Sequence, residues 1–474
     1  MSLIKSISGI RGNIGGVPGE NLTPLDILKF SLAYGTYIIQ ISPNLKHKVV
    51  IGRDARISGE MLKNIVASAL MSLGIEVIDM GFSSTPSVEL AVRSQEAQGG
   101  IIITASHNPS GWNALKLLDA QGEFLSKIEG EKILELAEKN NYSSFVPEDN
   151  LGSYIVNPYL DLDHIKQVLN LSLVDQKLIK KKNFKIVVDG INSVGGMIVP
   201  SLLKELGLKK IIELNCEPNG RFAHKPEPIA ENLSQIMERV KLEKADLGIV
   251  VDPDVDRLAF IDENGEMFGE EYTLVAIADY VLNNFSLVEA AHPGEYHKTT
   301  VSNLSSSRAL KDITEKHGGI YEAAAVGEVN VVTKMKEIKA VIGGEGNGGI
   351  ILPELHYGRD AVLGIALFLS HLAQKNIKMS ELKKELPEYF MVKDKMELNS
   401  EINVADILKM IKSDYAQEKI TDIDGIKINW PDSWVHLRAS NTEAIIRIYG
   451  EAKSLEKAEL IVNEIKLKIL AYIK

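Results

Sequence analysis

Short apolar runs that end abruptly in small and polar residues alternate with helical segments along most of the chain. The first set predicts strands at 48–52, 76–80 and 99–103, with a helix at 60–73 and a second one beginning at Thr85. Strands that alternate with helices in this way form parallel or mixed sheets covered by helices. The carboxyl ends of parallel strands share one edge of the sheet, where ligands bind in open α/β folds. We therefore expect an α/β fold whose functional loops follow the strands.

The alternation recurs twice, and the end of the chain differs. At 474 residues the chain is too long for a single core. From about residue 391 the pattern changes to strand, helix (404–416), strands and helix (455–473), after a linking helix at 379–388. The sequence predicts three related α/β units and a smaller α+β unit, four domains in all. Their predicted boundaries are 1–152, 153–264, 265–388 and 389–474.

The strand at 99–103 ends in the serine loop, Thr104-Ala105-Ser106-His107-Asn108-Pro109-Ser110-Gly111. A serine hydroxyl is a weak nucleophile until a neighbouring group activates it, and His107 stands beside Ser106. An ordinary surface turn has the same composition and is the simpler interpretation of these residues alone.

The strand at 246–251 ends in the aspartate loop, Asp252-Pro253-Asp254-Val255-Asp256-Arg257. Two carboxylates 4 Å apart repel by about 4 kcal/mol at an effective dielectric near 20, and a divalent cation relieves this repulsion. Oxygen ligands alone favour Mg²⁺. An EF-hand is excluded because Arg257 occupies the position that requires glycine. A solvated acidic turn is the alternative.

Two further loops have the composition of ligand sites. The glycine-rich loop, 343–349, matches the spacing G-x-G-x-x-G, but Pro353 lies where a dinucleotide-binding helix would run. Glu345 is therefore interpreted as a ligand of sugar hydroxyls. Arg438 and Arg447 flank Ser440, Asn441 and Thr442, a set that suits a phosphate clamp or a capped turn.

Composition excludes several classes of partner. The net charge is −11 without a long basic run, which argues against a nucleic-acid partner but leaves room for local arginines to bind an anionic substrate. The single cysteine, Cys216, fits a reducing compartment. Neither a signal-peptide core nor an apolar run of membrane-spanning length is present, so we expect a cytoplasmic protein without a membrane partner.

Taken together, the loops predict phosphoryl transfer. They offer a serine to carry the phosphoryl group, a magnesium site, arginines, a second phosphate site and a loop suited to a polyol. The P-loop pattern of many nucleotide-dependent kinases, G-x-x-x-x-G-K-[ST], is absent.

The ordered motifs resemble the α-D-phosphohexomutases, the phosphoglucomutase/phosphomannomutase superfamily. They include Ser8-Gly9-Ile10-Arg11-Gly12, Gly52-Arg53-Asp54, the serine and aspartate loops, Gly344-Glu345-Gly346-Asn347-Gly348-Gly349 and Arg438 to Glu443. By this resemblance Ser106 is carried as phosphoserine and binds Mg²⁺ together with Asp252, Asp254 and Asp256. Arg11, His107, Lys116 and Arg257 would surround the phosphoryl group, with Lys116 or His107 as general acid/base.

The resemblance also implies that the four domains surround a central cleft, and it assigns the substrate site. Gly327, Glu328, Glu345, Asn347 and Gly348 would contact the sugar, and Arg438, Ser440, Asn441, Thr442 and Arg447 would hold the phosphate that does not react. The implied reaction interconverts hexose 1- and 6-phosphates through a sugar 1,6-bisphosphate, which also serves as activator. The phosphosugar is the expected partner, and the protein is expected to be a monomer or homodimer.

Departures from the family pattern fall on substrate recognition. Gly346-Asn347-Gly348-Gly349 stands where many members have Ser-Gly-His, Glu328 replaces a common histidine and Ala444 a common proline. The glycine-rich loop resembles a subgroup with archaeal-type phosphoglucosamine mutases and phosphomannomutases. Glucosamine phosphate is the preferred substrate interpretation, with mannose or glucose phosphate as the alternative. A sugar phosphatase and a non-enzymatic sugar-phosphate sensor are the rival functions.

Overall fold

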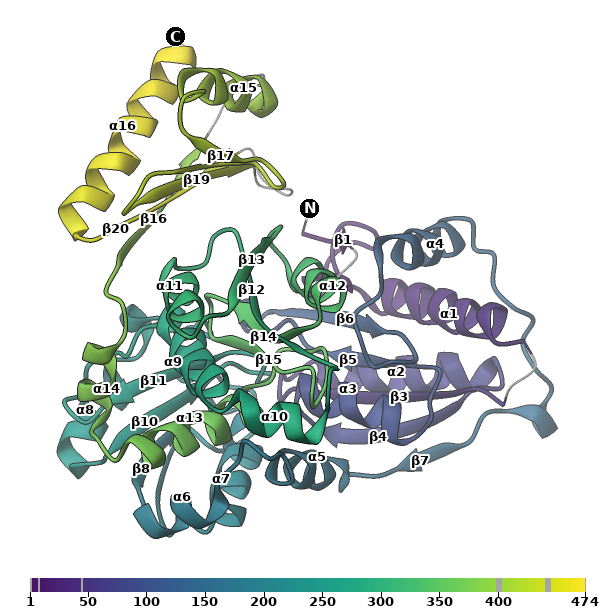
Figure 1. The fold of residues 1–474 in the computed structure, drawn as a ribbon. Helices are drawn as coiled ribbons and strands as arrows, with labels where there is room; N and C mark the ends of the chain where they lie inside the picture. Colours follow the sequence, from purple (N-terminus) through teal and green to yellow (C-terminus); the bar gives the residue numbers. More distant parts are fainter. Residues whose placement is uncertain (1, 7–8, 44–45, 398–402, 440–444, 474) are drawn as a thin grey trace.

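The computed structural model describes residues 2–6, 9–43, 46–397, 403–439 and 445–473, which form three α/β domains and a smaller C-terminal domain (Figure 1). The first domain has a seven-stranded mixed sheet in the order β1-β2-β6-β5-β3-β4-β7. Its elements are β1 (Ile4–Ser6), β2 (Gly9–Asn13), α1 (Pro24–Ile41), β3 (Lys48–Arg53), α2 (Gly59–Ser72), β4 (Glu76–Phe82), α3 (Thr85–Ser94), β5 (Gly99–Ile103), β6 (Trp112–Leu118), α4 (Lys127–Glu138) and β7 (Tyr154–Val156).

The second and third domains each have a four-stranded mixed sheet, in the orders β11-β10-β8-β9 and β13-β12-β14-β15. The second domain contains α5 (Leu160–Leu169), α6 (Gln176–Lys182), β8 (Lys185–Asp189), α7 (Gly195–Glu205), β9 (Lys210–Leu214), α8 (Ser234–Glu243), β10 (Leu247–Val251) and β11 (Leu258–Asp262). The third contains α9 (Glu270–Asn283), α10 (Phe285–Ala291), β12 (His297–Asn303), α11 (Ala309–Lys316), β13 (Ile320–Ala324), α12 (Glu328–Ile338), β14 (Ala340–Glu345), β15 (Gly349–Ile351), α13 (Ala361–Lys375) and α14 (Met379–Glu385).

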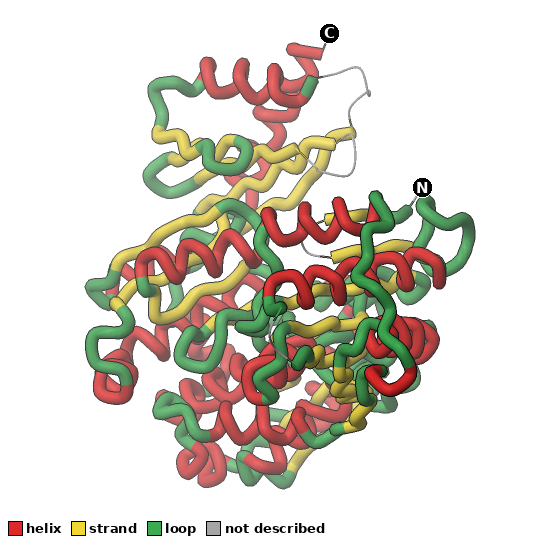
Figure 2. The backbone as a smooth tube through the Cα atoms, turned by 90° about the vertical axis from the view of Figure 1, so that its right-hand side faces the viewer, coloured by secondary structure: helices red, strands yellow, loops and turns green. Residues whose placement is uncertain are grey.

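The fourth domain has an antiparallel sheet in the order β16-β20-β19-β18-β17. Its elements are β16 (Phe390–Glu397), α15 (Val404–Asp414), β17 (Lys419–Thr421), β18 (Ile426–Asn429), β19 (Trp434–Ala439), β20 (Ile445–Ala452) and α16 (Leu455–Ile473). Figures 1 and 2 show α15 and α16 on the side of this sheet that faces away from the other domains. The opposite face of the sheet is therefore free to meet the third domain.

The three α/β domains share one arrangement that positions the functional loops. In each, a buried parallel strand is followed by an antiparallel neighbour: β5 by β6, β10 by β11 and β14 by β15. The serine, aspartate and glycine-rich loops connect these pairs. The predicted fold class is confirmed, but the antiparallel partners make all three sheets mixed, because a short polar loop returns the chain beside the strand it has just left.

One predicted helix is too long. The helix expected at 379–388 ends at Glu385, and Leu386 already has extended backbone with ψ 152°. Pro387 explains the difference, because proline disfavours helical geometry in the residue before it and cannot donate its own backbone hydrogen bond.

The largest core joins the second and third domains. Phe368 of α13 stacks on Phe260 of β11 with ring centroids 3.9 Å apart, and Phe268 meets Phe368 edge-on at 5.4 Å. All three rings are fully buried. This contact fixes the strand that leaves the aspartate loop against the helix that follows the glycine-rich loop.

Among the helices of the described residues, none alone is long and apolar enough to cross a membrane. Helices α9 and α10 pass that test only as a pair, bent by 63° at their junction.

Replacing Phe368 by alanine should lower the free energy of unfolding of the second and third domains by about 3–5 kcal/mol, because both aromatic contacts are lost and a cavity remains. Urea unfolding followed by far-ultraviolet circular dichroism measures the change. Leu470→Ala, at a side chain that is 46% exposed, should cost less than about 1 kcal/mol. Equal losses in both variants would contradict the assignment of this core.

Candidate active site

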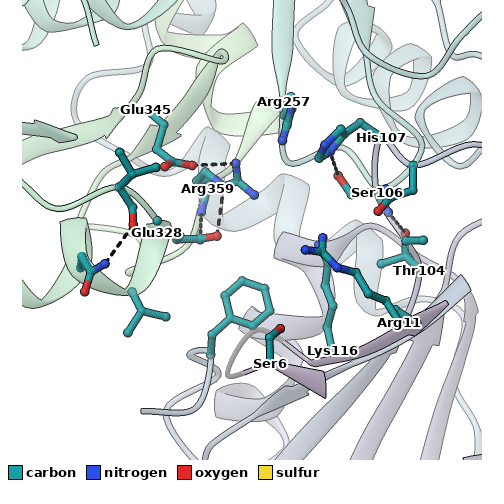
Figure 3. A pocket seen from close by; sticks show the side chains of 18 of the residues that line it. Ser6, Arg11, Thr104, Ser106, His107, Lys116, Arg257, Glu328, Glu345 and Arg359 are labelled. Atoms are coloured by element: carbon teal, nitrogen blue, oxygen red, sulfur yellow. Dashed lines mark hydrogen bonds and ion pairs between the residues drawn. The ribbon is translucent and has the colours of Figure 1, made fainter. Parts of the chain in front are cut away.

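A cavity of about 550 Å³ lies where the serine loop, Arg257 of the aspartate loop, Glu345 and the start of α12 meet. Arg11 of β2 and Lys116 of β6 enter it from the first domain, side by side (Figure 3). Their position follows from strand pairing, because Arg11 lies opposite Ala114 and side chains alternate along β6, so Lys116 shares this face. The structure thus brings together residues that are far apart in the sequence.

Ser106 lies in a backbone conformation that the sheet alone does not impose. Its φ is +47°, in the left-handed region that a non-glycine residue rarely adopts. The buried guanidinium of Arg56 donates hydrogen bonds to the carbonyls of Ser106 and Asn108, both at 2.6 Å, and to two further carbonyls of this segment. Asp54 in turn accepts from Arg56 Nε at 3.0 Å. The Arg56–Asp54 pair therefore holds the serine loop in place.

The Ser106 hydroxyl points at the aspartate loop. Its Oγ donates to Asp252 Oδ2 at 2.7 Å and lies 3.3 Å from Nδ1 of His107. Burial, together with the charge of Arg257, holds the pKa of His107 well below its usual range. His107 is therefore a neutral imidazole beside Ser106.

The three aspartates form a compact oxygen cluster. Asp252, Asp254 and Asp256 are buried, and one carboxylate oxygen from each lies within 4.8 Å of the others. Burial, reinforced by the charges of Asp256 and Asp254, raises the pKa of Asp252 well above its usual range. Three carboxyl groups packed this closely repel one another when ionised, and a cation between them would be stabilised.

Protein donors hold at least one oxygen of each aspartate, and both oxygens of Asp252 accept hydrogen bonds. Asp252 Oδ1 accepts two backbone N–H bonds, Asp254 Oδ2 accepts from Thr85 and Lys116, and Asp256 Oδ2 accepts from Arg359 at 2.6 Å. Oδ1 of Asp254 and Oδ1 of Asp256 are buried and accept no hydrogen bond from the described residues. Two orphaned carboxylate oxygens beside the Asp252–Ser106 pair form the donor set of a hard divalent cation such as Mg²⁺.

Lys116 is an ion-pair partner of this cluster. Its Nζ lies 2.7 Å from Asp254 Oδ2 and 3.4 Å from Asp256 Oδ2. Burial alone would lower the pKa of Lys116, but these two carboxylates raise it above its usual range. Lys116 is therefore a cation at neutral pH.

Arg359, a residue without a predicted role, joins the aspartate cluster to Glu328 and Glu345. Its guanidinium contacts Asp256 at 2.6 Å, Glu345 at 3.0 Å and Glu328 at 3.0 Å (Figure 3 shows the last two). Its backbone N–H also donates to Glu328 at 2.9 Å. In sequence Arg359 is only a lone cation before an apolar helix, so no local signal identifies it.

The predicted sugar-binding residues occupy different positions. Gly327, Glu328 and Glu345 line the cavity, whereas Asn347 and Gly348 are not among its lining residues. Asn347 instead donates to Glu345 Oε2 at 3.3 Å, and the Gly348 carbonyl accepts from the Leu258 N–H at 3.2 Å. The strand β15, which runs antiparallel to β14, takes the place of a dinucleotide-binding helix.

The predicted phosphate clamp lies on the fourth domain. Arg438 and Arg447 are direct cross-strand partners on β19 and β20, so both can contact one anion. Arg438 Nε lies 3.5 Å from Asp424, whose carboxylate accepts from the N–H of Val326 at the rim of the cavity. Neither arginine lines the cavity itself. Ser440, Asn441 and Thr442 lie outside the described residues.

Adding Mg²⁺ should stabilise the protein against heat through the aspartate cluster. At a concentration about 100 times its Kd, a ligand that binds only the folded state adds about 2.7 kcal/mol, and differential scanning calorimetry should show a corresponding rise in Tm. In Asp256→Asn most of this rise should disappear, because a charged ligand atom is lost. Glu238→Gln, at an exposed carboxylate of the same domain, should keep it. A full Mg²⁺ response in Asp256→Asn would show that the ion binds elsewhere.

Comparisons with known proteins agree with the four-domain fold. The four domain families of phosphoglucomutase/phosphomannomutase match in order: α/β/α domain I at residues 3–144, domain II at 162–265, domain III at 270–390 and the C-terminal domain at 375–468.

Among relatives, a phosphoglucomutase/phosphomannomutase of Thermococcus kodakarensis is 38% identical, covering 96% of this chain and 97% of its own. A phosphoglucosamine/phosphogalactosamine mutase of Sulfurisphaera tokodaii is 35% identical with the same coverage. A phosphoglucomutase/phosphomannomutase family structure from Burkholderia thailandensis shares the fold, with a TM-score of 0.81, 23% identity, and coverage of 99% and 98% of the two chains. The chain therefore belongs to the phosphoglucomutase/phosphomannomutase family and is a phosphohexomutase-type enzyme.

Proposed function

We propose that this protein interconverts the 1- and 6-phosphates of a hexose, with Ser106 as the phosphoryl carrier and glucosamine phosphate as the preferred substrate. The observation that carries the proposal is the position of Ser106 Oγ, 2.7 Å from Asp252 and at the edge of a cluster suited to Mg²⁺. A hydroxyl in this position can be phosphorylated and can return its phosphoryl group beside a cation.

The reaction consists of two transfers. First, a sugar hydroxyl oxygen forms a bond to the phosphorus on Ser106 and gives its proton to a base. The bond from phosphorus to Ser106 Oγ breaks, and the leaving Oγ takes up a proton. The product is a sugar 1,6-bisphosphate, which reorients in the cavity so that its other phosphoryl group faces Ser106. Its other phosphoryl group is then transferred to Ser106 Oγ, whose own proton is removed. Added sugar 1,6-bisphosphate would serve as activator by phosphorylating Ser106.

The residues around Ser106 divide the remaining tasks. Mg²⁺, held by Asp252, Asp254, Asp256 and Ser106, would neutralise charge that develops on the phosphoryl oxygens. Arg11 and Arg257 line the same cavity and can donate hydrogen bonds to those oxygens. His107 and Lys116 are the two candidates for the proton transfer, because both approach Ser106 or its metal ligands.

The charge at the sugar end favours an amino sugar. Glu328 and Glu345 present two carboxylates, and their shared cation, Arg359, is also shared with Asp256. The cavity as a whole is lined by more basic than acidic side chains, but at this end two carboxylates share one guanidinium. An ammonium group on the substrate is stabilised there more than a neutral hydroxyl would be.

Mannose or glucose phosphate is the second candidate substrate. The relative from Thermococcus kodakarensis, named phosphoglucomutase/phosphomannomutase, supports it, whereas the relative from Sulfurisphaera tokodaii supports amino sugars. Glu345 would then accept hydrogen bonds only from the hydroxyls that these sugars share.

A coupled mutase assay with Mg²⁺ and a trace of sugar 1,6-bisphosphate tests the proposal. We expect kcat/KM for glucosamine 6-phosphate to exceed that for glucose and mannose 6-phosphates by about tenfold or more, which corresponds to about 1.4 kcal/mol. Ser106→Ala should abolish turnover of all three. Turnover by Ser106→Ala would refute the carrier assignment, and equal turnover of the three sugars would replace the amino-sugar assignment by a broad specificity.

A variant at Arg438 distinguishes the proposed mutase activity from a phosphatase activity. A mutase must hold the bisphosphate again after it has turned, so Arg438→Ala should lower mutase kcat/KM by at least about tenfold. Lys409→Gln, an exposed change on α15 of the same domain, should leave it within about twofold. Release of inorganic phosphate is measured in parallel. Near-normal activity in Arg438→Ala, with stoichiometric phosphate release, would favour the phosphatase.

A further inference from the structure

A second cavity, of about 460 Å³, lies between the third and fourth domains. It is bounded by the edge strand β13 of one sheet and by β17 and β18 of the other. None of its lining residues lines the active-site cavity. We call it the interdomain crevice.

The interdomain crevice gathers positive charge in an acidic protein. Five of its lining side chains are basic and one, Glu322, is acidic, whereas the whole chain has a net charge of −11. The third domain supplies three cations and the fourth supplies two. The five basic residues are Arg308, Lys311, Lys334, Lys419 and Lys427.

Most of these cations lack a close carboxylate inside the crevice. Lys311 and Lys334 pair with Glu315 and Glu337 on their own helices, at 3.6 and 2.8 Å. Within the described parts of the chain, Arg308, Lys419 and Lys427 form no ion pair. The positive charge of the interdomain crevice is therefore only partly compensated.

Lys427 is the buried member of the set. Lys427 is only 8% exposed. Its Nζ donates to the Leu304 carbonyl at 2.7 Å and lies 3.8 Å from the ring centre of Trp434. The neighbouring acid, Glu451, is already engaged by Trp434 Nε1 at 2.7 Å and by a backbone N–H. Burial, with a contribution from Arg308, lowers the pKa of Lys427 to about 7. A cation in this position is costly unless an anion accompanies it.

The crevice is connected to the sugar end of the active site. Ser306, one of its lining residues, accepts the N–H of Gly346 in the glycine-rich loop at 3.0 Å. Leu304 follows Asn303, whose side chain donates to Glu345 at 2.9 Å. A ligand that displaces residues 304–306 would therefore change the position of the Glu345 side chain.

We propose that the interdomain crevice binds a small anion carrying phosphoryl groups, which bridges the third and fourth domains and acts as an effector of the enzyme. Its volume lies within the range of about 300–1,000 Å³ that is usual for small-ligand sites. Phosphoryl oxygens match lysine and arginine donors, and contacts from both domains would hold the fourth domain in one orientation. The ligand can be an inorganic diphosphate or a phosphorylated metabolite, and the experiment distinguishes them.

Calorimetric titration of pyrophosphate into the full chain tests the proposal. Arg11→Gln/Arg257→Gln serves as background, so that binding at the active site is weakened. In that background, adding Lys334→Gln/Lys419→Gln should weaken pyrophosphate binding at least about tenfold. The matched control, Lys316→Gln/Lys409→Gln, removes the same charge from exposed positions outside the crevice and should change the affinity less than about twofold. Equal effects of the two pairs would overturn the proposal.

Hydrogen exchange locates the site independently of affinity. Pyrophosphate should slow amide exchange in 320–324 and 419–429, and this protection should be lost in Lys334→Gln/Lys419→Gln. Protection confined to the serine or aspartate loop would overturn the proposal. Replacing pyrophosphate by glucosamine 6-phosphate or by AMP then identifies the source, because a metabolite site should bind one of them more tightly than pyrophosphate, and an inorganic site should prefer pyrophosphate.

Discussion

The mutual repulsion of three buried aspartates is the constraint on which the rest of the site depends. Asp252 is held by backbone N–H groups of its own loop, Asp254 by Thr85 and Lys116, and Asp256 by Arg359. Oδ1 of Asp254 and Oδ1 of Asp256 accept no hydrogen bond from the described residues and would be left for the proposed cation.

This requirement explains why residues from three domains must meet. Lys116 reaches the aspartates from the first domain, and Arg359 reaches them from the third while also holding Glu328 and Glu345. The aromatic contact of Phe260 with Phe368 fixes the second and third domains relative to each other, and this keeps Arg359 within reach of Asp256. One guanidinium therefore links the proposed metal site to the proposed sugar site.

The sequence predicted what is local. Apolar strands ending in Ser106, in the aspartates and in Glu345 identified three functional loops, because a buried strand followed by polar residues is a short-range pattern. It did not predict the antiparallel partners β6, β11 and β15, or the roles of Arg56 and Arg359. Their roles depend on contacts such as Arg359 to Asp256, across more than a hundred positions of chain, which no spacing or periodicity encodes. The prediction that Glu328 belongs to the substrate site was likewise local, and it did not include the contacts of both its carboxylate oxygens with Arg359.

The backbone around Ser106 has a consequence for turnover. Its left-handed conformation is held by Arg56 through carbonyl oxygens, so the support does not involve the hydroxyl that reacts. Gaining or losing a phosphoryl group on Oγ changes the charge of the side chain but leaves every one of those bonds in place. In the proposed reaction the loop can therefore keep one backbone conformation through both phosphoryl transfers, with no refolding step between them.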